Sequence, residues 1–208
     1  MPTELLDETA KKILEAASRR FLHYGYGKTT MSEIAKDCNM STGNVYRYFP
    51  AKLDIAEAFV RALRRVQMAE LAAAAAADGL TPPEQLRALL KTKFKLAYER
   101  FHDRPKAFEL SAAILNERPE LAVEWEMAEG DLIAKLLRNG AAAGVFPQAD
   151  YDHFAKIIQD TVFRFTSPAV FFEGDFDALS AELDEVVDLI LDALACRRAT
   201  CEEEAPNR

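Results

Sequence analysis

Residues 29–52 read TTMSEIAKDCNMSTGNVYRYFPAK, a stretch that contains two short helical patterns separated by a turn. Thr30 and Glu33 have the spacing of a capping box, in which a hydroxyl and a carboxylate each bond an open backbone N–H at a helix start. The first helix is predicted to follow at once and to run to Asp37, with Ile34 facing inward.

The turn after this helix is predicted at Cys38, Asn39 and Met40. Asn39 can adopt the left-handed backbone conformation at little steric cost, which suits a tight turn between two helices. Ser41 then has the side chain of an N-cap for a second helix of about two turns, ending near Phe49. The stretch therefore predicts a helix-turn-helix.

The second helix is predicted to bury one side only, through Val45 and Phe49. The residues that it displays are Thr42, Gly43, Asn44, Tyr46, Arg47 and Tyr48. Such groups bond well to phosphates and base edges and poorly to an apolar partner, so the pattern indicates contact with DNA. Tyr46 and Tyr48 are alternatively packing residues, but two tyrosines around an arginine favour the DNA role.

These positions resemble the TetR family of bacterial transcriptional regulators. The pattern that carries the resemblance is Thr30-x-x-Glu33-Ile34-Ala35, followed by Ser41-x-Gly43-Asn44-Val45-Tyr46-x-Tyr48-Phe49-x-x-Lys52. It occupies roughly the first quarter of the chain, and the remainder is similar in layout. The sequence departs from the common pattern at Asn39, where glycine is usual, and at Ala51, where serine is frequent. The second change removes an N-cap, worth ~1 kcal/mol.

The resemblance implies a role for each displayed residue. It implies phosphate contacts by Thr30, Thr42, Tyr46, Tyr48 and Lys52, and a close approach of the backbone at Gly43. Thr42, Asn44 and Arg47 are the candidates for base edges, although Arg47 can equally bind a phosphate. The whole predicted DNA-binding set is Thr30, Ser41, Thr42, Gly43, Asn44, Tyr46, Arg47, Tyr48 and Lys52.

Charge is distributed unevenly along the 208 residues, whose formal net charge is −8. Residues 1–65 hold 11 Lys and Arg against 8 Asp and Glu, whereas residues 66–208 hold 15 against 26. The parts therefore carry +3 and −11, and such an asymmetry orients the first part toward a polyanion. Because the first part is only slightly basic, we expect a limited number of phosphate contacts.

The composition favours a cytoplasmic protein. Half of the residues are apolar, yet no apolar run is long enough to cross a bilayer, and charges interrupt the N-terminal MPTELLDETAKK where a signal peptide is apolar. The three cysteines show no CxxC spacing, which fits a reducing compartment and argues against a disulfide scaffold or a zinc site. Cys38 is expected to be a small buried residue, with a redox role as the alternative.

Helical periodicity predicts an all-α fold of about nine helices. Beyond the two helices above, the predicted ranges are 5–24, 52–77, 83–102, 106–116, 119–143, 150–165 and 177–196. We expect a three-helix helix-turn-helix DNA-binding domain at 1–51, a helical effector-binding and dimerisation domain at 52–200, and a frayed polar tail at 201–208. The helix 52–77 lacks Gly and Pro, and is expected to connect the two domains stiffly.

The last two predicted helices carry more apolar surface than one packing seam requires. They are either a fully buried pair or a two-fold interface that meets its copy as a four-helix bundle. The resemblance implies a homodimer. The residues assigned to this interface are Phe154, Ile158, Val162, Leu183, Val187, Ile190 and Leu194.

The body is rich in large aromatic residues, which at helical spacing are usually core. The resemblance implies that it also encloses a small, largely apolar or aromatic effector. The residues assigned to this effector site are Phe94, Tyr98, Phe108, Trp125, Phe163 and Arg164. Arg164 stands between two phenylalanines, and either pairs with a core carboxylate or holds an anionic ligand group.

No catalytic or metal chemistry is predicted. The three histidines lack partners at ligand spacing, and nucleophile motifs, phosphate-binding glycine loops and Glu-x-x-His pairs are absent from the sequence. We therefore expect no cofactor and no enzyme. The predicted function is a DNA-binding transcriptional regulator, with a ligand-responsive repressor favoured. Its expected partners are double-stranded operator DNA, a second copy of the chain and a small effector. No contact with a membrane is expected. The alternative is a helical scaffold protein that keeps the fold without binding an operator.

Overall fold

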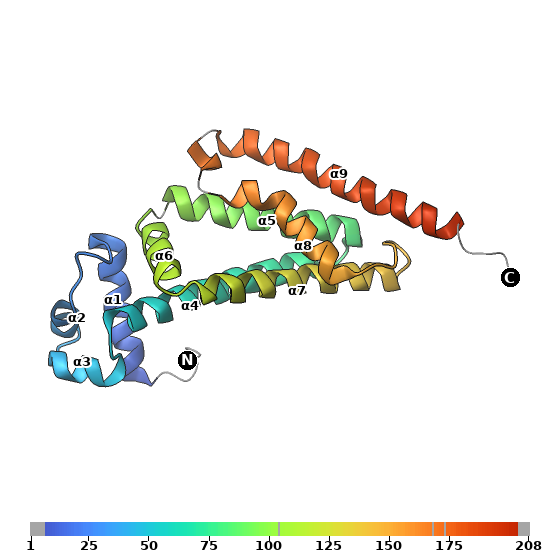
Figure 1. Cartoon of the computed structure of the whole chain (residues 1–208). Helices are drawn as coiled ribbons and strands as arrows, with labels where there is room; N and C mark the ends of the chain where they lie inside the picture. The colour runs from blue at the N-terminus through green and yellow to red at the C-terminus, as the bar shows by residue number, and fades with distance from the viewer. Residues whose placement is uncertain (1–6, 104, 168, 173, 204–208) are drawn as a thin grey trace. The chain divides into compact units, whose positions relative to one another are not determined.

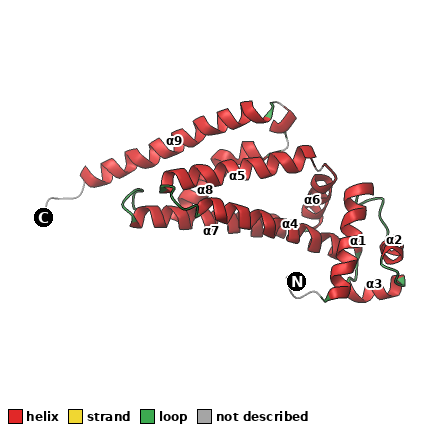
Figure 2. Ribbon diagram, turned by 180° about the vertical axis from the view of Figure 1, so that it is seen from behind, coloured by secondary structure: helices red, strands yellow, loops and turns green. Residues whose placement is uncertain are grey.

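The computed structural model describes residues 7–103, 105–167, 169–172 and 174–203, and side chains as far as Cys196. Every regular element in these ranges is a helix (Figure 2). In chain order they are α1 (Glu8–Tyr24), α2 (Met31–Asp37), α3 (Thr42–Tyr48), α4 (Lys52–Ala75), α5 (Pro82–Asp103), α6 (Pro105–Glu117), α7 (Glu120–Ala142), α8 (Tyr151–Val162), the 3-10 helices η2 (Phe163–Thr166) and η3 (Val170–Phe172), and α9 (Phe176–Glu203) (Figure 1). The all-α prediction is confirmed.

The chain divides into two compact units that do not follow the sequence order. The first unit contains Met1–Gln67 and Arg100–Val123, and the second contains Met68–Glu99 and Glu124–Arg208. Helices α4, α5 and α7 each contribute residues to both units. The predicted domain ranges 1–51, 52–200 and 201–208 stay a prediction.

In the first unit, α1 supplies one long apolar face to the core. Ile13, Ala17 and Phe21 on this face are buried, at the three- and four-residue spacing of an amphipathic helix. Asp7 caps the helix start, because its Oδ1 accepts a hydrogen bond from Ala10 N at 2.8 Å. The predicted start at residue 5 lies outside the described residues.

Helices α4 and α6 complete the first unit. Ala51 N donates to Asp54 Oδ2 at 2.9 Å, so a carboxylate three residues onward closes the start of α4. This bond is the half of a capping box in which the carboxylate accepts, and the half that a serine hydroxyl at position 51 would supply is missing with Ala51. Helix α6 packs against α1, and Arg118, just after α6, forms ion pairs with Asp54 and Glu57.

The second unit has a core of aromatic and aliphatic side chains. Phe94 stacks on Phe176 at 5.1 Å between centroids, and Tyr98 meets Phe171 edge-on at 5.4 Å. One ion pair is largely removed from water, between Lys93 Nζ of α5 and Glu129 of α7 at 2.7 Å.

Two predicted helix ends are wrong. Helix α8 ends at Val162 instead of continuing to Phe165, because the chain tightens into the 3-10 turn η2. Helix α9 continues to Glu203, so the first three residues of the predicted frayed tail are helical. No Gly or Pro interrupts the chain between Gly174 and Pro206, which explains why the helix does not stop at Cys196.

Candidate nucleic-acid interface

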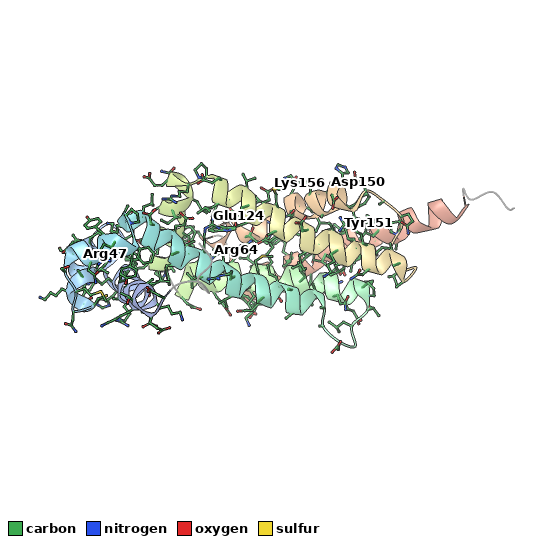
Figure 3. All side chains as sticks on the ribbon, turned by 90° about the horizontal axis from the view of Figure 1, so that it is seen from below. Arg47, Arg64, Glu124, Asp150, Tyr151 and Lys156 are labelled. Atoms are coloured by element: carbon green, nitrogen blue, oxygen red, sulfur yellow. The ribbon has the colours of Figure 1, made fainter. Side chains whose placement is uncertain are left out.

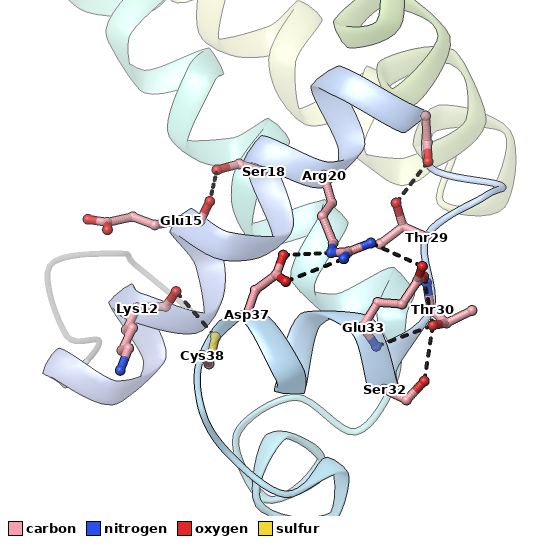
Figure 4. Close-up of polar contacts among 11 residues, drawn as sticks. Lys12, Glu15, Ser18, Arg20, Thr29, Thr30, Ser32, Glu33, Asp37 and Cys38 are labelled. Atoms are coloured by element: carbon pink, nitrogen blue, oxygen red, sulfur yellow. Dashed lines mark hydrogen bonds and ion pairs between the residues drawn. The ribbon is translucent and has the colours of Figure 1, made fainter.

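The predicted capping box closes the start of α2. Glu33 N donates to Thr30 Oγ1 at 3.3 Å, and Thr30 N donates to Glu33 Oε2 at 2.8 Å (Figure 4). The Thr30 hydroxyl also donates to the same carboxylate oxygen at 2.8 Å. These hydrogen bonds lower the pKa of Glu33, because they favour its charged form. The capping box is confirmed, and it uses much of the bonding capacity of Thr30.

The turn between α2 and α3 has the predicted conformation. Asn39 adopts a φ of 54°, in the left-handed region, and Met40 N donates to Ala35 O at 2.9 Å. Ser41 Oγ accepts from Asn44 N at 3.2 Å, as an N-cap does. Cys38 is buried with its Sγ 3.7 Å from Lys12 O, and burial raises the pKa of this thiol.

Helix α3 has one buried side and one side open to solvent. Val45 is buried within the helix, and Phe49 is buried just after it. Tyr46 is 49% exposed, Tyr48 is 37% exposed, and Arg47 is also exposed (Figure 3). The apolar side of α3 thus packs on the first unit, and the other side displays residues that can bond DNA.

Gly43 lies on the open side of α3. A Cβ atom built at this position would meet nothing within 4 Å. The packing of the protein itself therefore does not require a glycine here. A missing side chain at an exposed helix position instead allows another molecule to approach the backbone closely.

An ion-pair cluster joins α1 to α2. Arg20 Nε donates to Asp37 Oδ2 at 2.6 Å, and Arg20 Nη1 lies 3.1 Å from Glu33 Oε1 (Figure 4). The bond from Arg20 lowers the pKa of Asp37. Sequence reasoning missed Arg20, because only the folded chain brings residues 13 and 17 positions apart together.

Lys52 is oriented inward, which the sequence did not indicate. Its Nζ donates to Tyr26 O and to Thr29 O, both at 2.8 Å, and lies 4.2 Å from the centroid of the Tyr26 ring. Burial lowers the pKa of Lys52, and the charge of Glu33 partly opposes this shift. Of the predicted DNA-binding residues of α3, Gly43, Tyr46, Arg47 and Tyr48 are exposed, and Thr42 and Asn44 are partly exposed. Lys52 instead lies against the α1–α2 turn.

Two family models match the chain that bears this surface. The model of bacterial regulatory proteins of the tetR family matches residues 13–59. The model of the tetracyclin repressor-like C-terminal domain matches residues 82–187, more than half of the chain. The chain belongs to the TetR family. The predictions of the family and of its DNA-binding fold are confirmed.

Individual TetR-family relatives are similar over different lengths. The uncharacterized HTH-type transcriptional regulator YuxN of Bacillus subtilis is 45% identical over 47 residues, which are 23% of this chain and 16% of that protein. This chain spans less than half the length of the curated relatives that it matches.

Solved TetR-family structures share the fold over most of their length. A regulator from Mesorhizobium loti has a TM-score of 0.68 and 18% identity, over 90% of this chain and 95% of that one. SmeT of Stenotrophomonas maltophilia, in complex with triclosan, has a TM-score of 0.64 and 23% identity, over 90% of this chain and 91% of that one. Likeness at these identities shows the fold alone.

The residues predicted for the TetR-type effector site are not gathered in one unit. Phe94 and Tyr98 belong to the aromatic cluster of the second unit, together with Phe176, which sequence reasoning missed because it opens a helix. Phe108 packs on Phe101 in the first unit at 5.3 Å between centroids. Phe108 therefore belongs to a different unit from Phe94 and Tyr98, and the effector set stays a prediction.

Three further residues of the predicted effector set lie nearer the surface of the second unit. Trp125 is half-buried, and Phe163 is 66% exposed. Arg164 forms an ion pair with Glu182, and both side chains are about half exposed. Arg164 thus pairs with a carboxylate, as one of its two predicted roles required, but at the surface instead of in the core.

The residues assigned to the dimer interface need a correction. Ile158, Val162, Leu183, Val187 and Leu194 are all buried within a single chain. Side chains with so little accessible surface have little left for a second chain, so these five are core residues. Phe154 and Ile190 are partly exposed and remain candidates. Among the large apolar residues of α8 and α9 whose side chains the structure describes, the exposed ones are Ile157 and Leu189, 45% and 69% exposed.

Two kinds of feature are absent from the described residues. No helix among them is long and apolar enough to cross a membrane. Likewise, no group of three or more His, Cys, Asp or Glu side chains in the described part of the chain could hold a metal ion.

Proposed function

We propose that this DNA-binding transcriptional regulator is a repressor that binds a palindromic operator as a homodimer and responds to a small effector. The observation that carries the proposal is the open side of α3. It displays two tyrosines, an arginine and a glycine whose Cβ position is empty, on a seven-residue helix that is capped and packed on its other side. A helix of this kind fits the major groove.

The proposed contacts divide into two kinds. Asn44 and Arg47 read base edges, with Thr42 beside them at the start of α3. The hydroxyls of Tyr46 and Tyr48 donate hydrogen bonds to phosphates on either side of the groove. Ser41 and Thr30 cap the two helices, and their hydroxyls can also approach phosphates at the helix starts.

Dimerisation would place two α3 helices on one operator. A two-fold pair reads two half-sites about one DNA turn apart, ~34 Å, which explains why a palindrome is expected. On the exposed side of α9, Ala178, Ala181, Leu189 and Ala193 share one helical face with Glu182, Glu185 and Asp192. The four apolar residues are the proposed contact with a second chain. Small residues on this face let a second helix approach closely.

The proposed effector is small and largely apolar or aromatic. SmeT, a structure of the same fold, binds triclosan. In this chain, Phe94, Tyr98, Phe171 and Phe176 form an aromatic cluster against which such a molecule can pack. Helix α4 contributes to both compact units, and is the element through which an effector would alter α3. A coupling of ~1–3 kcal/mol is typical of such a link.

The TetR family consists of transcriptional regulators, and we propose accordingly that this chain is not an enzyme and acts in the cytoplasm, where bacterial operators lie. The scaffold alternative gives no reason for the tyrosines and arginine on α3. A helix that binds no nucleic acid has no functional requirement for two exposed tyrosines and an exposed arginine.

A selection experiment tests the proposal. The purified protein is incubated with a pool of duplexes that carry a central randomised region of about 30 base pairs, and bound duplexes are amplified over several rounds. We expect enrichment of one palindromic sequence with half-sites about one turn apart. A pool that stays random after binding and amplification would favour the scaffold alternative.

A further inference from the structure

Lys52 stands at the exit of α3, four residues after Tyr48 ends that helix. An ammonium has three N–H donors, and two of them go to Tyr26 O and Thr29 O at 2.8 Å each. The ammonium also lies 4.2 Å from the centroid of the Tyr26 ring, a favourable place for a cation. Little of its bonding capacity remains for a phosphate.

The turn that receives Lys52 is itself tightly bonded. Thr29 Oγ1 donates to Gly25 O at 3.0 Å, and Thr29 N donates to Tyr26 O at 3.2 Å. The Tyr26 ring packs edge-on against Phe21 of α1 at 5.5 Å between centroids. The turn that holds the two carbonyls is therefore itself fixed to α1. The bonds of Lys52 to these carbonyls tie the start of α4 to that turn.

Apart from these contacts, the position of Lys52 is unfavourable for a positively charged side chain. It is the first residue of α4, where the helix dipole repels a cation. The side chain is also partly withdrawn from water, which disfavours its charge. The two carbonyls and the ring offset these costs, so the contact is a specific part of the fold.

We infer that Lys52 is a positioning residue, which locks the exit of α3 onto the α1–α2 turn and so determines how sharply α3 distinguishes DNA sequences. The inference rests on the proposed DNA-binding function. Val45 and Phe49 bury the apolar side of α3, and the two hydrogen bonds of Lys52 add a second attachment, between the exit of α3 and the α1–α2 turn. Bonds to base edges need accurate placement of side chains, whereas bonds to phosphates tolerate small shifts.

The test compares two duplexes and three single variants. The duplexes are the sequence enriched from the random pool and a scrambled duplex of equal length, each titrated at several salt concentrations. Lys52→Met removes the donor, and Tyr26→Leu removes the ring beside it. Lys36→Met is the matched control, since it removes one positive charge from an exposed position on α2.

For Lys52→Met we expect the affinity ratio between the enriched and scrambled duplexes to fall by about tenfold. Affinity for the scrambled duplex and the slope of log K against log salt should both stay close to wild type. Tyr26→Leu should lower the ratio in the same direction. The double variant should lose little more than Lys52→Met alone, because the two residues act through one contact. Lys36→Met should leave the ratio unchanged.

Other outcomes overturn the inference. Equal loss of affinity on both duplexes, with a slope reduced by about 0.9, identifies Lys52 as a phosphate contact. A lower melting temperature with an unchanged ratio and slope shows a role in stability alone. If Lys52→Met does not fold by circular dichroism, Tyr26→Leu decides, and an unchanged ratio in that variant refutes the inference. If the wild-type protein enriches no sequence, both the proposed function and this inference fail.

Discussion

At the scale of single residues, Arg47, which is exposed on α3, and Asn44, which is partly exposed, carry the proposed base readout. Replacing either by Ala should cost ~1–3 kcal/mol on the enriched duplex and relax the preference at one base pair. Binding measured on single-base variants of the enriched duplex identifies that position. Equal losses on enriched and random duplexes would instead assign both side chains to phosphates.

The sequence predicted most local features of this site. Thr30, Glu33 and Ser41 form the caps that their spacing indicated, because capping depends on residues three or four apart. The inward orientation of Lys52 could not be predicted in the same way. Its partners are carbonyls of residues 23 and 26 positions earlier, and main-chain acceptors leave no trace in residue type.

At the scale of elements, we expect the packing of α1 on α2 to depend on pH. Hydrogen bonds from Thr30 lower the pKa of Glu33 below its ordinary value of 4.5. A hydrogen bond from Arg20 lowers the pKa of Asp37 below its ordinary value of 3.8. Each folded-state pKa is therefore lower than the unfolded one. The contribution to stability is present above the ordinary values and is lost as pH falls through the folded values.

The double variant Glu33→Gln, Asp37→Asn should therefore lose less stability than wild type on acidification from about pH 5 to about pH 3. Urea unfolding at a series of pH values measures this difference. Glu33→Gln keeps a side chain that is compatible with a capping box, so the variant should still fold. Parallel pH profiles in the two proteins would show that the cluster does not contribute.

The ends of elements were harder to predict than their presence. Gly25, Gly79 and Gly144 adopt positive φ values, and Gly25 and Gly144 follow the ends of α1 and α7. The end of α8 was missed, because its change to a 3-10 turn falls within a continuous apolar pattern. The extent of α9 was also missed, because a polar composition alone does not stop a helix.

At the scale of the whole molecule, the exposed side of α9 is the proposed dimer contact. Leu189→Glu should convert the protein from about twice its 23.3 kDa chain mass to that mass, because a charge would lose its water without gaining a partner. Sedimentation at micromolar concentration measures the change. Val66→Glu is the control, since Val66 of α4 is similarly exposed at 60%.

The variant Leu189→Glu could not have been designed from the sequence alone. Apolar periodicity marks both α8 and α9 as amphipathic but does not separate the side that faces the core from a side that faces another chain. Leu183 and Val187 were assigned to the interface on this basis, yet both are buried within one chain. A charge at either position should unfold the chain instead of separating a dimer.

The central claim is that paired α3 helices read an operator. Its most direct test is a titration of three duplexes with the wild-type protein, in which fluorescence anisotropy measures binding. The first duplex is the enriched palindrome, the second has one half-site scrambled, and the third is random. The account predicts two chains per palindrome and an affinity at least ~100-fold above that for random DNA, a modest specificity for such proteins. Scrambling one half-site should remove most of that advantage. Equal affinity for all three duplexes would contradict the claim that paired α3 helices read an operator.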